Sequence, residues 1–207
     1  MQFLAFLFGW WVYRPYSRLV AFVMRAKGIK VGRNFYIQGV PYLKIQGRPQ
    51  DIQIGSDVSI MGGVDIRNRE QGRVIIGDGV KLDTSCRLIA ANNAVLEIGP
   101  GCRIGAYTII NCGEDITIGG DTMMAGFCYI QSSNHGTRKG ILIKDQPHTY
   151  GKISIGRDVW LGGHVTVLAS VTIGDGAIVG AKSVVTKDLP ENSICAGIPA
   201  KMVKVRE

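Results

Sequence analysis

Residues 155–184 read Ile155-Gly-Arg-Asp-Val-Trp160, Leu161-Gly-Gly-His-Val-Thr166, Val167-Leu-Ala-Ser-Val-Thr172, Ile173-Gly-Asp-Gly-Ala-Ile178 and Val179-Gly-Ala-Lys-Ser-Val184. Each unit of six opens with an aliphatic residue, and Gly follows that residue in four of the five units. The fifth position is always small: Val159, Val165, Val171, Ala177 and Ser183. A period of six fits neither a helix nor simple strand alternation, so it indicates a repeat architecture.

A period of six has a direct structural meaning, namely a chain that turns a corner every six residues. The aliphatic residue of each unit points inward, and the small residue packs beside it near the bend. Three units close one triangular turn, and stacked turns bury a continuous apolar column. The pattern therefore predicts an all-β chain built as a parallel solenoid.

Further turns begin upstream of this stretch. They open at Ile54, Ile76, Ile98 and Ile118, before those at Ile155 and Ile173. A bare turn needs 18 residues, but the step from Ile118 to Ile155 is 37 residues long. The surplus predicts a loop expelled from the coil over residues 132–152. Long loops in an economical repeat are usually functional.

The two ends of the chain leave the repeat, which predicts three regions: 1–28, 29–187 and 188–207. Residues 1–13 are rich in aromatic and aliphatic side chains, and basic residues follow from Arg14. This uncharged run is shorter than the roughly 20 residues that span a bilayer, and it lacks a basic leader and a small-residue cleavage site.

We expect Pro15 to break this run and residues 16–27 to form a short amphipathic helix. That helix suits either a membrane interface or packing on the first coil or a neighbouring subunit. Residues 188–207 are expected to turn back and cap the open end of the coil.

Composition and charge narrow the class of protein. The 28 Gly residues lack collagen spacing, and we attribute them to tight corners that need positive φ. The formal charge of +8 suits an anionic membrane or a phosphorylated ligand better than nucleic acid, because no nucleic-acid-binding motif is present. The five Cys residues have no paired spacing, and three occupy small-residue positions, so they are predicted to be reduced core residues in a cytoplasmic protein.

The expelled loop carries the best candidates for catalysis. It contains His135 at its root and His148 further along, whereas His164 lies on a corner of the coil. Histidine titrates near neutral pH and is the commonest general base, so His135 is the candidate base. His148 is expected to be mobile or to contact substrate. No His or Cys pair has the short spacing of a closed zinc site, so no metal is predicted.

The repeat resembles the left-handed parallel β-helix of hexapeptide-repeat acyltransferases. Ser132-Ser-Asn-His135-Gly, the units from Ile155 onward, and the ending Gly197-Ile-Pro199-Ala-Lys201 are similar to the galactoside, maltose and xenobiotic acetyltransferase group. The aromatic and basic N-terminus is similar to members that acetylate lipopolysaccharide, capsule or exopolysaccharide. The resemblance implies an acetyl-CoA-dependent O-acetyltransferase acting on a sugar hydroxyl in the biosynthesis of such a bacterial glycan.

The resemblance also implies roles for particular residues. His135 would be the general base, and the cofactor groove would lie between two subunits of a homotrimer. Trp160 would pack on the cofactor, and the Gly163 and Ala181 backbones would bond its pantetheine arm. The nucleotide end would meet Thr186 and Lys187. Family members often hold the acceptor sugar with an Asn one or two coils before the histidine. Whether Asn111 corresponds to that residue stays open at this point.

Two other functions stay open at this point. The first is an N-acetyltransferase of an amino-sugar nucleotide, which would use the same fold, cofactor and base. The second is a non-catalytic β-helix scaffold, which needs no histidine in the expelled loop. The protein is expected in the cytoplasm, with residues 1–28 as a possible peripheral contact with the inner face of the membrane.

Overall fold

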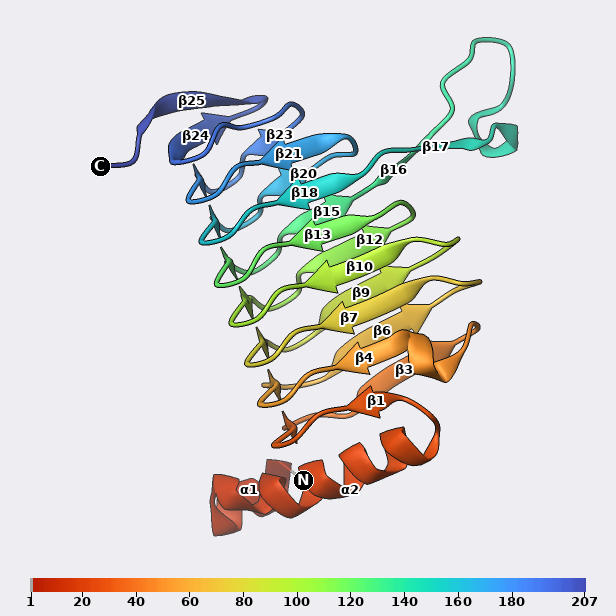
Figure 1. Cartoon of the computed structure of the whole chain (residues 1–207), viewed down its shortest axis with the longest axis vertical. Coiled ribbons are helices and arrows are strands. Elements are labelled where there is room, and N and C mark those ends of the chain that lie inside the picture. The colour runs from red at the N-terminus through yellow and green to blue at the C-terminus, as the bar shows by residue number, and fades with distance from the viewer. Residues whose placement is uncertain (1) are drawn as a thin grey trace.

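The computed structural model describes residues 2–207 and shows a parallel β-helix (Figure 1). Two helices, α1 (Gln2–Phe8) and α2 (Tyr13–Ala26), precede the coil, with a short 3₁₀ turn, η1 (Trp10–Val12), between them. Further 3₁₀ turns are η2 (Pro49–Asp51) and η3 (Ile143–Asp145). The predicted all-β solenoid with a helical N-terminal segment is confirmed.

Three parallel sheets form the faces of the coil. The first face consists of β1 (Lys30–Val31), β4 (Ile52–Ile54), β7 (Arg73–Ile76), β10 (Val95–Ile98), β13 (Ile116–Ile118), β18 (Ile153–Ile155) and β21 (Val171–Ile173). The second face begins with β2 (Tyr36–Ile37), β5 (Ser59–Ile60), β8 (Lys81–Leu82), β11 (Arg103–Ile104), β14 (Met123–Met124), β19 (Trp160–Leu161) and β22 (Ile178–Val179). The third face consists of β3 (Pro41–Ile45), β6 (Val64–Asn68), β9 (Cys86–Ala90), β12 (Ile109–Cys112), β15 (Tyr129–Gln131), β20 (Thr166–Val167) and β23 (Val184–Val185).

The opening residue of each hexapeptide points into the coil, as predicted. Ile155, Leu161 and Val167 are buried, and so are the small residues of the fifth position. The strands stack in register, so that Ile118, Ile155 and Ile173 lie above one another on the first face. This continuous column is the hydrophobic core, because each coil covers the apolar side chains of its neighbours.

The glycines have two different roles. Gly79, Gly101 and Gly176 do adopt positive φ at corners. For the Gly after each aliphatic residue the predicted reason is wrong, because none of these adopts positive φ. A Cβ on Gly77 would lie 2.8 Å from the Pro100 nitrogen in the next coil, and one on Gly119 would lie 2.5 Å from the Gly156 carbonyl carbon. These glycines permit close stacking of coils.

The ends of the coil are both covered. Helix α2 contains Pro15 in its first turn, where a missing N–H costs nothing, so the predicted break at Pro15 is wrong and Gly9 separates the two helices. At the other end β24 (Ser193–Gly197) adds to the second face, and β25 (Ala200–Val205) pairs with it antiparallel after a turn at Ile198-Pro199. Among residues 2–207, no helix has the length and apolar character needed to cross a membrane.

The thiols are buried in the core. All five Cys residues are free, and burial raises the pKa of the Cys86 thiol from 9.0 to about 12. The unfolded chain then loses this proton at a lower pH than the native chain. The stabilisation is complete below about pH 9 and is lost as the pH rises toward 12.

We therefore expect Cys86→Ala to lose less stability than the parent protein between about pH 8 and about pH 11. The measurement is the free energy of unfolding by urea at each pH, plotted against pH for both proteins. The slopes are compared, because the cavity left by the substitution lowers the free energy equally at every pH. Parallel slopes for the two proteins would contradict the assignment of this alkaline loss to Cys86.

Candidate active site

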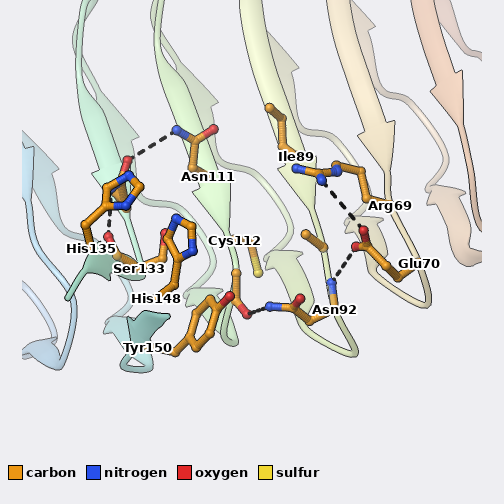
Figure 2. Close-up of a pocket in the computed structure, with 13 residues that line it drawn as sticks. Arg69, Glu70, Ile89, Asn92, Asn111, Cys112, Ser133, His135, His148 and Tyr150 are labelled. Atoms are coloured by element: carbon orange, nitrogen blue, oxygen red, sulfur yellow. Dashed lines mark hydrogen bonds and ion pairs between the residues drawn. The ribbon is translucent and has the colours of Figure 1, made fainter. Parts of the chain in front are cut away.

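A cavity of about 450 Å³ lies on the outer side of the third face, at the corner that leads back to the first face (Figure 2). The expelled loop closes one end of it, and the rest is formed by β9, β12, the end of β15 and the corners of earlier coils. The lining residues are Arg69, Glu70, Ile89, Ala91, Asn92, Asn111, Cys112, Gly113, Gln131, Ser133, His135, His148 and Tyr150. A pocket of this size, with convergent polar groups, is typical of a small-molecule site.

His135 is held by a short antiparallel hairpin. Strand β16 (Ser133–His135) pairs with β17 (His148–Tyr150), and η3 lies in the loop between them. At the base of the hairpin, the Ser132 hydroxyl accepts hydrogen bonds of 3.0 Å from the Gly113 and Glu114 amides of the preceding coil. These contacts tie the hairpin to the solenoid, so the imidazole stands on a fixed strand.

His148 comes further along the chain, but in space it lies directly opposite His135, at the same level of the hairpin. The two residues are paired across the hairpin, and their ring centroids are 4.3 Å apart. Tyr150 extends the row, with its ring centroid 6.2 Å from that of His148. This pairing could not be predicted from the sequence. The register of the hairpin depends on the loop between its two strands, and that loop does not follow the six-residue repeat.

Amide side chains form the polar floor next to the histidines. The Asn111 Nδ2 donates to the Tyr129 hydroxyl at 3.2 Å and lies 3.4 Å from the Gln131 Oε1. The Gln131 Nε2 donates to the Ser133 carbonyl at 2.7 Å. The Asn111 Oδ1 accepts no hydrogen bond from any of residues 2–207, so it is free to accept one from a ligand hydroxyl.

The far end of the cavity carries charge. The Glu70 carboxylate accepts a 2.9 Å hydrogen bond from the Asn92 amide and lies 3.7 Å from the Arg69 guanidinium. The Asn92 side chain donates to the Gly113 carbonyl at 2.8 Å. Figure 2 shows these groups in a row on neighbouring coils, with the two histidines at the opposite end.

Sequence reasoning missed most of these residues. Asn111 and Gln131 are register partners on adjacent coils, at outward positions that follow the inward Ile110 and Ile130. Polar residues at equivalent outward positions just before the loop are a signal that could have found them. Arg69 and Asn92 lie in enlarged corners, for which the six-residue period carries no information.

The predicted cofactor residues lie apart from this cavity within one chain. Trp160 is 49% exposed on the second face, and Gly163 and Ala181 occupy the next corner. The Gly163 and Ala181 amides donate to no group within residues 2–207, so both are available to a ligand. Thr186 and Lys187 are exposed on the same edge of the coil as the cavity, but they follow β23, which is two strands beyond β15 on the third face.

No metal site emerges from the described part of the chain. Within residues 2–207, no three His, Cys, Asp or Glu side chains are grouped in a way that could hold a metal ion. His164 lies on the corner next to Gly163, where its ring stacks on Phe127 with centroids 4.8 Å apart.

Comparisons with known proteins place the chain among acyltransferases. Residues 152–187 match the family model described as bacterial transferase hexapeptide (six repeats). The putative lipopolysaccharide biosynthesis O-acetyl transferase WbbJ of Escherichia coli K12 is 35% identical over 144 residues, which cover 66% of this chain and 74% of WbbJ. The probable acetyltransferase Rv3034c of Mycobacterium tuberculosis is 36% identical over 156 residues, which cover 74% of this chain and 50% of that protein.

A solved structure supports the same grouping. The crystal structure of the polySia-specific acetyltransferase NeuO superposes with a TM-score of 0.67 and 26% identity, covering 86% of this chain and 81% of NeuO. The similarity thus extends well beyond residues 152–187, which match the family model. The chain belongs to the hexapeptide-repeat acetyltransferase family.

Proposed function

We propose that the protein transfers an acetyl group from acetyl-CoA to a sugar hydroxyl of a bacterial lipopolysaccharide, capsule or exopolysaccharide, with His135 as the general base. The observation that carries the proposal is His135 on a fixed strand at the edge of a polar cavity, beside the free Asn111 Oδ1. The names of WbbJ and NeuO support a glycan acceptor, since one is named for lipopolysaccharide biosynthesis and the other is named as polySia-specific.

The chemistry needs one base and one donor. His135 takes the proton of the acceptor hydroxyl as the oxygen attacks the thioester carbonyl carbon of acetyl-CoA. A backbone N–H stabilises the negative charge that develops on the carbonyl oxygen. The carbon–sulfur bond then breaks, and the CoA sulfur receives the proton from the imidazolium. No covalent enzyme intermediate is required.

The two halves of the site come together between subunits in this proposal. His135 and Trp160 lie on different parts of one chain, and the cavity of His135 contains none of the predicted pantetheine contacts. In a homotrimer, the cavity corner of one subunit would face the second face of its neighbour. The exposed Trp160 and the free amides of Gly163 and Ala181 fit an acyl-CoA arm there, while Lys187 suits a phosphate.

The direct test is transfer of labelled acetyl from acetyl-CoA to a panel of glycans and nucleotide sugars. We expect a labelled sugar product from which mild base releases acetate, because esters hydrolyse readily and amides do not. A base-stable product from an amino-sugar nucleotide would establish the N-acetyltransferase instead. Absence of both transfer and CoA binding would favour a non-catalytic scaffold.

Trp160→Ala is expected to raise KM for acetyl-CoA by up to about tenfold and to leave kcat nearly unchanged, because stacking on the cofactor adds to binding in both the ground and transition states. Trp11→Ala is the matched control, since Trp11 is also exposed but lies in the N-terminal segment. Initial rates against acetyl-CoA concentration measure the effect. An unchanged KM would remove Trp160 from the cofactor site.

A further inference from the structure

The N-terminal segment divides into one helix that packs and one that does not. Helix α2 lies across the first coil and closes that end of the solenoid (Figure 1). Its buried face consists of Tyr13, Ser17, Ala21 and Met24, and the Ile37 amide donates to the Ser17 hydroxyl at 2.9 Å. Of the two open alternatives, packing on the first coil therefore holds for α2.

The preceding residues expose apolar surface instead of burying it. Phe3, Phe6, Trp10 and Trp11 are 65–85% exposed, on α1 and η1. The exposed apolar surface continues along α2 through Leu19, Phe22 and Val23. Soluble monomers rarely expose contiguous apolar patches of this kind, and such patches mark an interaction site.

Arginines border this apolar surface. Arg14, Arg18 and Arg25 recur at helical spacing and line a cavity of about 490 Å³ between α2 and the first coil, together with Phe35 and Tyr36. The Arg25 guanidinium is fixed by hydrogen bonds of 2.9 and 2.6 Å to the Val31 and Gly32 carbonyls. Arg14 and Arg18 form no ion pair with any residue in the described range 2–207, so both can meet an external anion.

The net positive charge of the chain is concentrated at the N-terminal end of the coil. Residues 1–50 contain eight Lys and Arg and no Asp or Glu, and therefore account for the formal charge of +8. The remaining 16 Lys and Arg are balanced by the 16 Asp and Glu of residues 51–207. The first 50 residues therefore carry the whole net positive charge and attract an anionic surface, whereas residues 51–207 have no net charge.

We propose that residues 2–27 form a docking surface for an anionic phospholipid bilayer, termed here the N-terminal platform. The side chains of Phe3, Phe6, Trp10 and Trp11 enter the interface between headgroups and acyl chains, where Trp is favoured. Arg14 and Arg18 bind lipid phosphates, and their aliphatic stems follow the apolar surface. The platform then holds the coil by one end, with α2 against the bilayer. This proposal does not depend on the acetyl acceptor.

The test is co-sedimentation of the full chain with vesicles of equimolar phosphatidylcholine and phosphatidylglycerol, and with vesicles of phosphatidylcholine alone. We expect binding to the anionic vesicles that weakens as salt increases. Arg14→Gln/Arg18→Gln should weaken it roughly 30-fold. The matched control is Arg138→Gln/Lys139→Gln, which removes the same charge from the exposed expelled loop and should bind as the parent does. Thermal unfolding checks that both variants are folded.

Fluorescence gives an independent readout of insertion. In Trp160→Phe the only tryptophans are Trp10 and Trp11, and anionic vesicles should shift their emission to shorter wavelength as they leave water. Equal weakening by the two charge variants, or no spectral shift, would overturn the proposal. So would a larger assembly without vesicles that Trp10→Ser/Trp11→Ser disperses, if the parent also fails to bind vesicles. In that case a second copy of the chain covers the platform.

Discussion

His135→Ala is expected to lower kcat/KM for acetyl transfer by roughly 10²- to 10⁴-fold, which is the usual contribution of a positioned general base. The imidazole stands on β16 at the edge of the cavity that Asn111 also lines, so a hydroxyl bound there can meet both side chains. Without it, the hydroxyl must attack the thioester while still carrying its proton. The measurement is the rate of CoA release at increasing concentrations of the acceptor that the transfer assay identifies.

Two controls separate catalysis from structure. Affinity for CoA should be unchanged in His135→Ala, because the proposed cofactor contacts lie on Trp160, Gly163 and Ala181. His164→Ala removes an exposed imidazole from another corner of the coil and should reduce kcat/KM far less. Full activity in His135→Ala together with loss in His148→Ala would transfer the role of base to His148, whose ring lies 4.3 Å away.

Leu88→Ala is expected to lower the free energy of unfolding by roughly 2–5 kcal/mol. Leu88 is fully buried on β9, in register between Ile66 and Ile110 of the adjacent coils. The substitution removes apolar burial and leaves a cavity in the column, which stacked strands on both sides prevent from collapsing. Urea unfolding followed by circular dichroism gives the difference.

The control for this substitution is Leu142→Ala, because Leu142 is 65% exposed in the expelled loop. It makes the same chemical change and should alter stability by less than about 0.5 kcal/mol. Similar destabilisation by both substitutions would mean that the column of inward aliphatic residues is not the main source of stability.

The repeat explains why the coil was predictable and the site only partly so. An aliphatic residue that recurs every six positions indicates an inward side chain, so the sequence alone predicts that Ile155, Leu161 and Val167 lie in the core. His135 was also identifiable, since it lies where the repeat is interrupted. The far end of its cavity is not predictable, because Asn92 and Arg69 belong to irregular corners and line the same cavity as His135 only through the stacking of coils.

The N-terminal segment shows the same limit. The sequence indicates an apolar and basic segment but leaves its partner open, and it predicts a break at Pro15. Only the packed structure shows that α2 covers the first coil while Phe3, Phe6 and Trp11 are exposed. Pro15 is tolerated in the first turn, since its missing N–H would have no helical partner there.

Sequence by itself determined the architecture of this protein: a parallel β-helix with a six-residue period, an expelled loop and a histidine at the root of that loop. These are local properties, since each hexapeptide specifies its own corner and its own inward residue. Tertiary structure alone decided the pairing of His135 with His148, the amide floor of Asn111 and Gln131, and the separation of Trp160 from the cavity. These depend on the size of each corner and on hairpin register, which set the distance between residues in different coils and which no periodic pattern records.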